Sequence, residues 1–237
     1  MSLLTRRRAL MLAKEKVLPY AYQQVEYLEC SGTQWIDTGF YLTSEDDIEF
    51  QISSENFKTN GKSATIFSSN DTGIDPNWHY SCNFGTSLDD RTVYLWKYYA
   101  TTYGYITRAY GMFEYYKPIV RTNGNKWDIS KGIGDNFTNN LYVESNGKNL
   151  WISGKVSPIP LILFAAWSST DNIMKPHQST PLRMHYFKVI NNNEIIAEFI
   201  PCYRKADCKT GMYDIINNKF CRNNGTGEFV LGNKIIN

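Results

Sequence analysis

Acidic residues are the first candidates for chemistry in this chain of 237 residues. A glycosidase built on a β-sandwich needs two carboxylates about 5.5 Å apart, which one strand supplies at positions i and i+2 or i+4. Asp47 and Glu49 have the first spacing, and Glu194 and Glu198 have the second. Because further acidic residues directly precede Asp47, we interpret that pair as the solvated edge of a strand. The Glu-x-Asp-x-x-Glu pattern of laminarinase-type sandwich hydrolases does not occur.

Histidine, serine and glycine patterns offer no other catalytic chemistry. His79, His177 and His185 lie in different segments, and none belongs to a His-x-x-x-His or Glu-x-x-His arrangement. No serine occupies a Gly-x-Ser-x-Gly elbow. Gly132 and Gly134 lack the third glycine of a dinucleotide-binding loop. The sequence therefore predicts a protein that is not an enzyme and has no catalytic residue.

Cysteines and acidic loops are the candidate metal ligands. The chain has five cysteines, an odd number that predicts free thiols in a protein without an export signal. Cys202, Cys208 and Cys221 cluster near the end, but they lack the paired C-x2-C spacing of a zinc site. The acidic residues at 45–47 and 89–90 are the oxygen ligands that calcium prefers. No spacing fixes their geometry, so we predict no metal and no cofactor, and calcium stays open.

Aromatic residues are the stronger candidates for a binding function. They make up 15% of the chain, and between Tyr94 and Tyr116 they are denser than a sandwich core alone needs. Sugars stack on such rings, which combine flat apolar area with a polar tip. We therefore predict a ligand site at Trp96, Tyr98, Tyr99 and Tyr103. The alternative is core packing, because alternate aromatic residues of a strand normally face the core.

Short strands separated by turn residues must position these side chains. The expected strands are residues 25–30, 35–38, 47–53, 64–69, 78–84, 92–96, 141–145, 149–153, 182–190 and 194–200. Pro201 is expected to end the last of them. No segment after Pro19 combines helix length with a period of 3.6 residues. The pattern predicts an all-β domain over residues 21–237, a two-sheet antiparallel sandwich.

The amino-terminal residues 1–20 are expected to form a separate helical arm. Thr5 can cap a helix that Pro19 ends, and a helix of about 12 residues is marginal alone in water. The arm packs on the sandwich, docks on another chain through Arg6, Arg7, Arg8 and Leu10, or forms a frayed solvated tail. The apolar run after the arginines is too short for a signal peptide, so we expect no export signal. The net charge of +2 is smaller than the charge of these three arginines, and it indicates no nucleic-acid partner.

Two segments at the ends of the chain resemble a known family. Residues 24–39, QVEYLECSGTQWIDTG, resemble the opening signature of concanavalin A-like (laminin G-like) jelly-roll proteins from gut bacteria and their phages. Residues 199–204, 211–214 and 219–229, which read FIPCYR, GMYD and KFCRNNGTGEF, resemble the closing signature. Residues 4–11, LTRRRALM, resemble a leader that precedes this domain in phage and prophage reading frames.

The resemblance implies a fold, a location and partners. It implies a concanavalin A-like jelly roll in a phage virion structural protein of the tail, fibre or capsid surface. The arm would bind other virion proteins, and the lectin-like domain would attach to a glycan or host surface. The protein would assemble in the host cytoplasm as a homo-oligomer, for which a trimer suits virion fibres. A bacterial carbohydrate-binding or adhesion protein and a sandwich-fold glycoside hydrolase are the alternatives.

The resembling motifs also have a structural interpretation. Their turn clusters are rich in glycine, serine and asparagine. Their large apolar residues are expected to join the terminal strands into one core, without binding a ligand; these are Tyr27, Trp35, Ile36, Phe199, Tyr213 and Phe220. No apolar run approaches the roughly 20 residues that span a bilayer, so no membrane span is expected.

Overall fold

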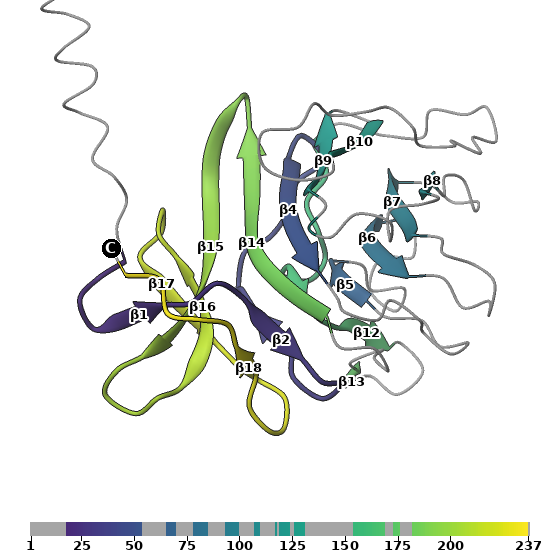
Figure 1. Cartoon of the computed structure of the whole chain (residues 1–237). Coiled ribbons are helices and arrows are strands. Elements are labelled where there is room, and N and C mark those ends of the chain that lie inside the picture. Colours follow the sequence, from purple (N-terminus) through teal and green to yellow (C-terminus); the bar gives the residue numbers. More distant parts are fainter. Residues whose placement is uncertain are drawn as a thin grey trace, which may run out of the picture.

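The computed structural model describes residues 18–53, 65–69, 78–84, 93–99, 107–109, 117, 119–123, 126–130, 154–168, 173–175 and 182–236. These residues form strands and turns without a helix, which confirms the all-β prediction. Two antiparallel sheets pack face to face (Figure 1). The predicted arm helix at residues 5–17 and the predicted strands at 141–145 and 149–153 lie outside the described residues. Among the residues described, no helix is long and apolar enough to cross a membrane.

The larger sheet has ten strands, and the long strands β14 and β15 run through its middle (Figure 1). Its main path is β10 (Lys126–Ser130), β9 (Ile119–Asn123), β4 (Asp47–Ser53), β14 (Leu182–Asn191), β15 (Glu194–Arg204), β16 (Thr210–Asp214) and β17 (Lys219–Arg222). Off this path, β1 (Tyr22–Gln24) pairs with β15, and β2 (Leu28–Cys30) pairs with β14 and with β18 (Val230–Leu231).

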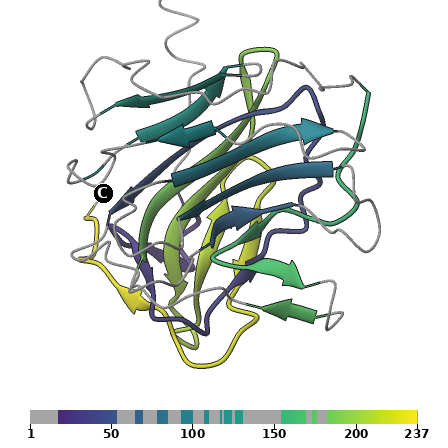
Figure 2. The ribbon, with the colours of Figure 1, turned by 90° about the vertical axis from the view of Figure 1, so that its right-hand side faces the viewer.

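The smaller sheet has six strands, and Figure 2 looks toward it. Its order is β3 (Ile36–Asp37), β11 (Ile162–Leu163), β5 (Thr65–Ser68), β6 (Trp78–Phe84), β7 (Val93–Tyr99) and β8 (Thr107–Ala109). A separate pair consists of β12 (Ala166–Ser168) and β13 (Ile173–Lys175). The predicted bounds of β4 and β6 agree with the structure, because both strands alternate large apolar residues that enter the core.

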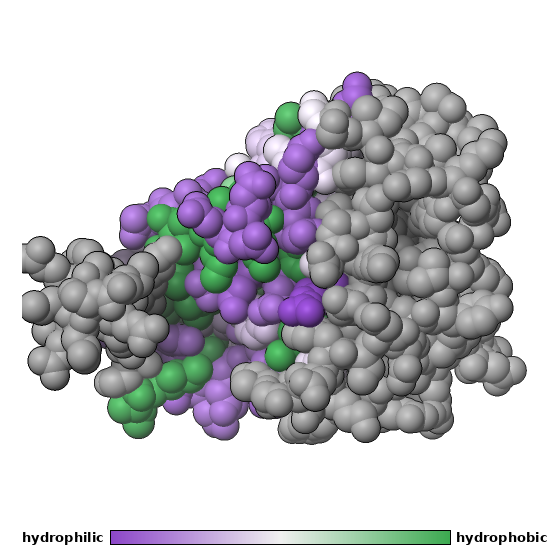
Figure 3. All heavy atoms as spheres, turned by 90° about the horizontal axis from the view of Figure 1, so that it is seen from above, coloured by the Kyte–Doolittle hydropathy of each residue, from purple (hydrophilic) through white to green (hydrophobic). Residues whose placement is uncertain are grey.

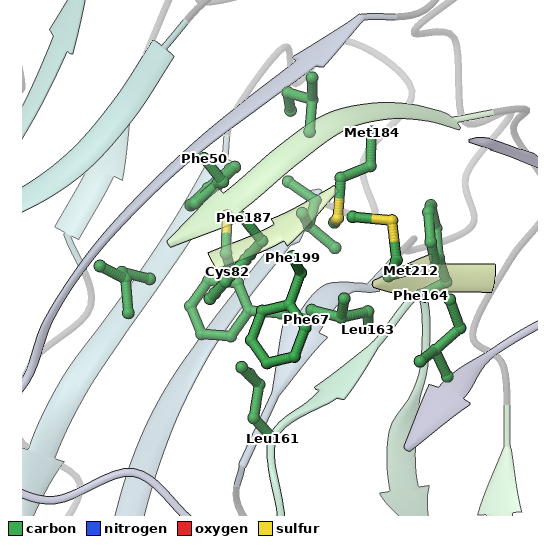
Figure 4. Close-up of a cluster of buried hydrophobic side chains, with 14 of the residues drawn as sticks. Phe50, Phe67, Cys82, Leu161, Leu163, Phe164, Met184, Phe187, Phe199 and Met212 are labelled. Carbon is green, nitrogen blue, oxygen red and sulfur yellow. The ribbon is translucent and has the colours of Figure 1, made fainter. Parts of the chain in front are cut away.

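Aromatic rings from both sheets meet in the core. Phe50 of β4 and Phe187 of β14 stack with their ring centroids 5.7 Å apart. Phe67 of β5 comes from the opposite sheet and meets Phe187 edge-on at 5.2 Å (Figure 4). Offset stacking and edge-on contacts are the arrangements that aromatic pairs favour. These contacts fix the two sheets against each other.

A buried tyrosine also joins the two sheets through hydrogen bonds. Tyr80 of β6 is fully buried, and its hydroxyl donates to the backbone oxygen of Asp46 at 3.2 Å. The same hydroxyl lies 3.1 Å from Oγ1 of Thr122, which accepts a bond from the backbone nitrogen of Ile48. Burial raises the pKa of Tyr80 well above its usual value. The phenol is thus a neutral polar link inside the core.

The prediction that Pro201 ends a strand is wrong, because β15 continues to Arg204. The pairing of β15 with β14 ends at Phe199, and its pairing with β1 begins at Cys202. Pro201 lies between the two ladders, and its carbonyl accepts a bond from the nitrogen of Val25 at 3.0 Å. Pro201 has no amide hydrogen, so this contact with Val25 consists of a single bond, and β15 continues through it.

Both terminal segments fill the fork where β14 and β15 diverge. β1 pairs with β15, and β2 pairs with the first residues of β14. β18 then pairs with β2, and the bridge between Val25 and Lys234 continues this contact. The side-chain nitrogen of Gln23 donates to the carbonyl of Ile235 at 2.9 Å. The first and last described strands, β1, β2 and β18, are thereby part of the larger sheet (Figure 1).

The turns of the two resembling segments form one joint. Oγ1 of Thr33 donates to the carbonyl of Thr226 at 2.7 Å, and the nitrogen of Thr226 donates to the carbonyl of Thr33 at 3.1 Å. The nitrogen of Asn224 donates to the carbonyl of Trp35 at 2.8 Å. A Cβ atom on Gly225 would collide with the carbonyl of Thr33, so only glycine fits there.

The large residues of these motifs do not form one core, contrary to the expectation. The structure divides them among separate clusters because successive residues of a strand face opposite sides of a sheet. Ile36 and Phe199 lie in the main core, Tyr213 and Phe220 on the outer side of the ten-stranded sheet, Trp35 beside Ile162, and Tyr27 against His185.

Candidate functional site

Three of the four predicted ligand residues lie on β7, and Tyr103 lies outside the described residues. The backbone register pairs Trp96 with Ser81, Tyr98 with His79, and Tyr99 with Trp78. Residues paired across two antiparallel strands stand on the same side of a sheet. Positions 96 and 98 therefore share one side of the six-stranded sheet, and position 99 belongs to the other.

The burial of β6 shows which side of the six-stranded sheet faces the core. Trp78, Tyr80 and Cys82 of β6 are fully buried in the main core. The alternate positions of β6, and the positions of β7 paired with them, therefore stand on the side of the sheet that faces away from the core. This side includes positions 94, 96 and 98 of β7, and the register adds Arg108 of β8 opposite Tyr94. We call it the second side of the six-stranded sheet.

Part of the second side is covered by other residues. Ser68 of β5 and Ser81 of β6 are paired on this side, and both are buried. On the neighbouring strand, Ile162 is fully buried and packs with Ile159 and Ala165. The candidate binding positions therefore adjoin a small apolar cluster at β11, and they extend from it toward β7 and β8.

Two of the four carboxylates considered for catalysis, Glu49 and Glu198, are engaged with neighbours on the outer side of the ten-stranded sheet, and Glu194 is exposed. Oε1 of Glu49 accepts from the hydroxyl of Tyr186 at 3.1 Å and from the ammonium of Lys188 at 3.3 Å. Lys188 also lies 3.9 Å from Glu198 on the next strand. Burial, and after it the charge of Glu49, raises the pKa of Tyr186. A cation thus stands between the two carboxylates.

Asp46 and Glu45 of the acidic loop accept hydrogen bonds from neighbouring segments. Asp46 is buried, and its carboxylate accepts from the nitrogen of Thr43 and from the side chain of Asn191, each at 2.7 Å. Glu45 accepts from the nitrogen of Gly154 at 2.6 Å, and this bond lowers the pKa of Glu45. Within the described ranges, no group of three or more His, Cys, Asp or Glu side chains is placed to hold a metal ion.

His185 connects three segments of the larger sheet. Its Nε2 lies 2.8 Å from Oγ of Ser53, and its Nδ1 lies 2.9 Å from the carbonyl of Glu26. A carbonyl can only accept, so Nδ1 carries the proton and Nε2 accepts from the serine. Burial, and then the charge of Lys117, lowers the pKa of His185 to about 4. Ser53 is buried, which suits a structural hydrogen bond better than a nucleophile.

The five cysteines are free thiols, as predicted. Cys30, Cys82, Cys202 and Cys221 are buried, and only Cys208 is exposed. Burial raises the pKa of Cys30 to about 11 and that of Cys202 to about 12. The buried thiols are therefore protonated and unreactive at neutral pH.

A cluster that the sequence did not suggest lies on the outer side of β1, β15, β16 and β17. Its rings are close together, with centroid distances of 4.7 Å from Tyr22 to Tyr213 and 5.1 Å from Tyr22 to Phe220. We call it the outer patch; its members are Leu18, Tyr22, Ile200, Cys202, Tyr213, Ile215 and Phe220. Seen from above, the described surface carries hydrophobic residues bordered by hydrophilic ones (Figure 3).

The outer patch is formed where buried residues stand on both sides of β15 and β16. All five residues of β16 are buried, and β15 sends Phe199 into the core and Ile200 into the patch. The apolar run of residues 199–203 in β15 was a signal in the sequence, but its partners on the outer side come from different strands. The predicted anchor residues Arg6, Arg7, Arg8 and Leu10 lie outside the described residues. Leu18, which belongs to the predicted arm of residues 1–20, is buried against Cys202 and Tyr213.

Comparison of the chain with protein-family models, with curated proteins and with solved structures finds no match.

Proposed function

We propose that the chain is a non-catalytic virion protein of a phage or prophage, with a concanavalin A-like jelly roll that attaches to glycans or a host surface. The observation that carries the binding proposal is the alternation on β7. Tyr94, Trp96 and Tyr98 occupy every second position and stand on the second side of the six-stranded sheet. Aromatic rings beside hydrogen-bonding residues are the usual composition of a sugar-binding surface.

The polar residues for such a surface stand at the paired positions. The register places Asn83 opposite Tyr94 and His79 opposite Tyr98, whereas Ser81, opposite Trp96, is buried. Arg108 follows on the next strand. Amide, imidazole and guanidinium groups supply the donors and acceptors that orient sugar hydroxyls.

The virion location is proposed from the resemblance of the two ends of the chain. The two motifs meet in the hydrogen-bonded joint between residues 33–35 and 224–226. This contact supports treating them together as the signature of one family. The arm is the proposed attachment to other virion proteins, and a homotrimer is the proposed assembly. A bacterial carbohydrate-binding protein with the same fold remains the competing proposal.

A glycan array on the purified chain tests the binding proposal. We expect Trp96→Ala and Tyr98→Ala to lose most of the signal while the protein stays folded, because each removes a stacking surface. Tyr41→Ala is the matched control, since Tyr41 is 52% exposed and lies outside the six-stranded sheet. Binding that survives both substitutions on β7 would contradict the proposed site.

Mass spectrometry of purified virions tests the location. The proposal expects peptides of this chain in particles that have been separated from soluble host proteins. Their absence from particles, together with presence at the bacterial surface, would favour the bacterial adhesion protein.

A further inference from the structure

The joint between the terminal turns contains a chemically labile dipeptide. Asn224 is exposed, and Gly225 follows it directly. The backbone nitrogen of a residue that follows asparagine can attack the asparagine side chain, and glycine allows this most readily because it has no Cβ atom in the way. The joint therefore holds both reactants of a spontaneous modification, the deamidation of Asn224.

The reaction has two steps and consumes only water. The nitrogen of Gly225 loses its proton to solvent and bonds to Cγ of Asn224, which closes a five-membered succinimide ring. The bond from Cγ to Nδ2 breaks, and the leaving nitrogen takes up a proton and departs as ammonia. Water then opens the ring at one of its two carbonyl groups, and the product is aspartate or isoaspartate.

In the folded chain the attacking nitrogen is held away from this reaction. The backbone nitrogen of Gly225 donates to Oδ1 of Asn223 at 2.9 Å. An N–H group that donates to an acceptor keeps its proton more firmly and is directed toward that acceptor. Attack on Asn224 requires this hydrogen bond to break.

The amide of Asn223 is itself fixed by the joint. Its Oδ1 also accepts from the backbone nitrogen of Trp35 at 3.3 Å, and its Nδ2 donates to the carbonyl of Gly227 at 2.8 Å. Two N–H donors on one side and a carbonyl on the other determine which atom of the amide is oxygen. A backbone bridge from Asn223 to Ile36 adds a further constraint. The acceptor that occupies Gly225 is thus held in place from several sides.

The backbone around Gly225 also opposes ring closure. The carbonyl of Thr33 packs so closely on Gly225 that a Cβ atom there would collide with it. On either side of the glycine, the nitrogen of Asn224 donates to the carbonyl of Trp35 at 2.8 Å, and the nitrogen of Thr226 donates to that of Thr33 at 3.1 Å. Ring closure rotates the backbone between these two bonds, so the joint must open first.

We propose that Asn224 is a deamidation site that reacts only when the joint opens, and that the side chain of Asn223 protects it in the folded chain. Isoaspartate inserts one additional carbon atom into the backbone, so the bonds from Asn224 and Thr226 to the opposite turn no longer fit together. The modification is therefore an irreversible mark of a joint that has opened. The proposal is independent of glycan binding and of the virion location.

Peptide mapping by mass spectrometry tests the site in the full chain. Trypsin releases residues 223–234 as one peptide, whose mass rises on deamidation and whose fragments locate the change. The same dipeptide begins at Asn60, Asn123 and Asn146, which serve as references for the rate in the urea-unfolded chain. We expect Asn224 to react at least about tenfold more slowly in the folded chain than in urea. Equal rates at Asn224 in both conditions overturn the proposal.

Three variants separate protection by Asn223 from general loosening of the joint. Asn223→Ala removes the acceptor and should speed deamidation of the folded chain by about tenfold. Asn223→Asp keeps an acceptor and should react like the original chain. Thr33→Ala removes a different bond of the joint, from Oγ1 of Thr33 to the carbonyl of Thr226 at 2.7 Å, and should speed the reaction less than Asn223→Ala.

Urea denaturation selects a temperature at which each variant is folded, and in urea all of them should react at the rate of the original chain. The proposal is overturned if Thr33→Ala speeds the reaction as much as Asn223→Ala. It is also overturned if Asn223→Asp reacts faster than Thr33→Ala, a comparison that holds even if Asn223→Ala does not fold.

Discussion

His185 is a buried histidine with a defined tautomer, and it makes stability depend on pH. Its folded pKa of about 4 is below the ordinary value of 6.5, because burial and the nearby Lys117 disfavour the imidazolium. The unfolded chain therefore binds the proton more readily between these two values. The neutral ring makes its full contribution to the free energy of unfolding above about pH 6.5, and this contribution is lost as the pH falls toward 4.

We therefore expect the free energy of unfolding to fall between pH 6.5 and 4 by about 3 kcal/mol more than in a His185→Gln variant. Urea denaturation at steps of pH measures both proteins. The variant is the control for carboxylates that titrate in the same range. Parallel curves for the two proteins would show that His185 is not the group responsible.

Tyr80 supports a second prediction at the scale of one residue. Tyr80→Phe removes the hydroxyl that donates to the carbonyl of Asp46 and contacts Thr122. The carbonyl would be left without this donor inside the core, which costs about 1 to 3 kcal/mol. Thermal and urea denaturation measure the loss. Tyr41→Phe removes an exposed hydroxyl and should change stability by less than about 0.5 kcal/mol; an equal loss in both variants would contradict the role of Tyr80.

Among the elements, the joint between the terminal turns has the sharpest steric requirement. Gly225→Ala would force the new methyl group against the backbone of Thr33, so the two turns must separate. We expect a loss of about 1 to 3 kcal/mol in unfolding free energy, as for other overpacked sites. Gly154→Ala is the comparison, because nothing lies within 4 Å of its Cβ position and only its φ of +75° opposes alanine. A smaller loss at Gly225 than at Gly154 would argue against a tight joint.

The strands best predicted from the sequence are those in which one side is apolar and the other polar. β4 and β6 belong to this class, and their bounds follow from alternation alone. The continuation of β15 beyond Pro201 could not be predicted, because it depends on the fork with β1, which is distant in the sequence. The outer patch was missed for a similar reason, since Tyr22, Tyr213 and Phe220 meet only after the four strands β1, β15, β16 and β17 have paired.

Part of the candidate site could be predicted from the sequence. Trp96, Tyr98 and Tyr99 belong to the predicted aromatic segment, and the structure places them together on β7. The division of these positions between the two sides of the sheet depends on the pairing with β6. A strand has no intrinsic inside, so its register against a buried neighbour decides which positions face the core.

For the whole molecule, the arm and the sandwich are predicted to be separable. Deletion of residues 1–17 should leave a folded domain, whose melting temperature stays within a few degrees of the full chain, but should abolish incorporation into the proposed virion. The cut belongs before Leu18, because that side chain is buried in the outer patch. A second truncation that also removes Leu18 should be less stable. Incorporation of the chain without residues 1–17 would contradict the anchor role.

The fork that both ends of the chain fill has a consequence for synthesis on the ribosome. Arg183 and Glu29 form an ion pair across β14 and β2 although they are 154 residues apart in the chain. At roughly 5 to 20 residues per second, β2 waits about 8 to 30 s for that partner. The bond from Gln23 to Ile235, across 212 residues, forms only after almost the whole chain has been made. A chain that stops before residue 230 therefore lacks β18, and it leaves the edge of β2 open to other strands.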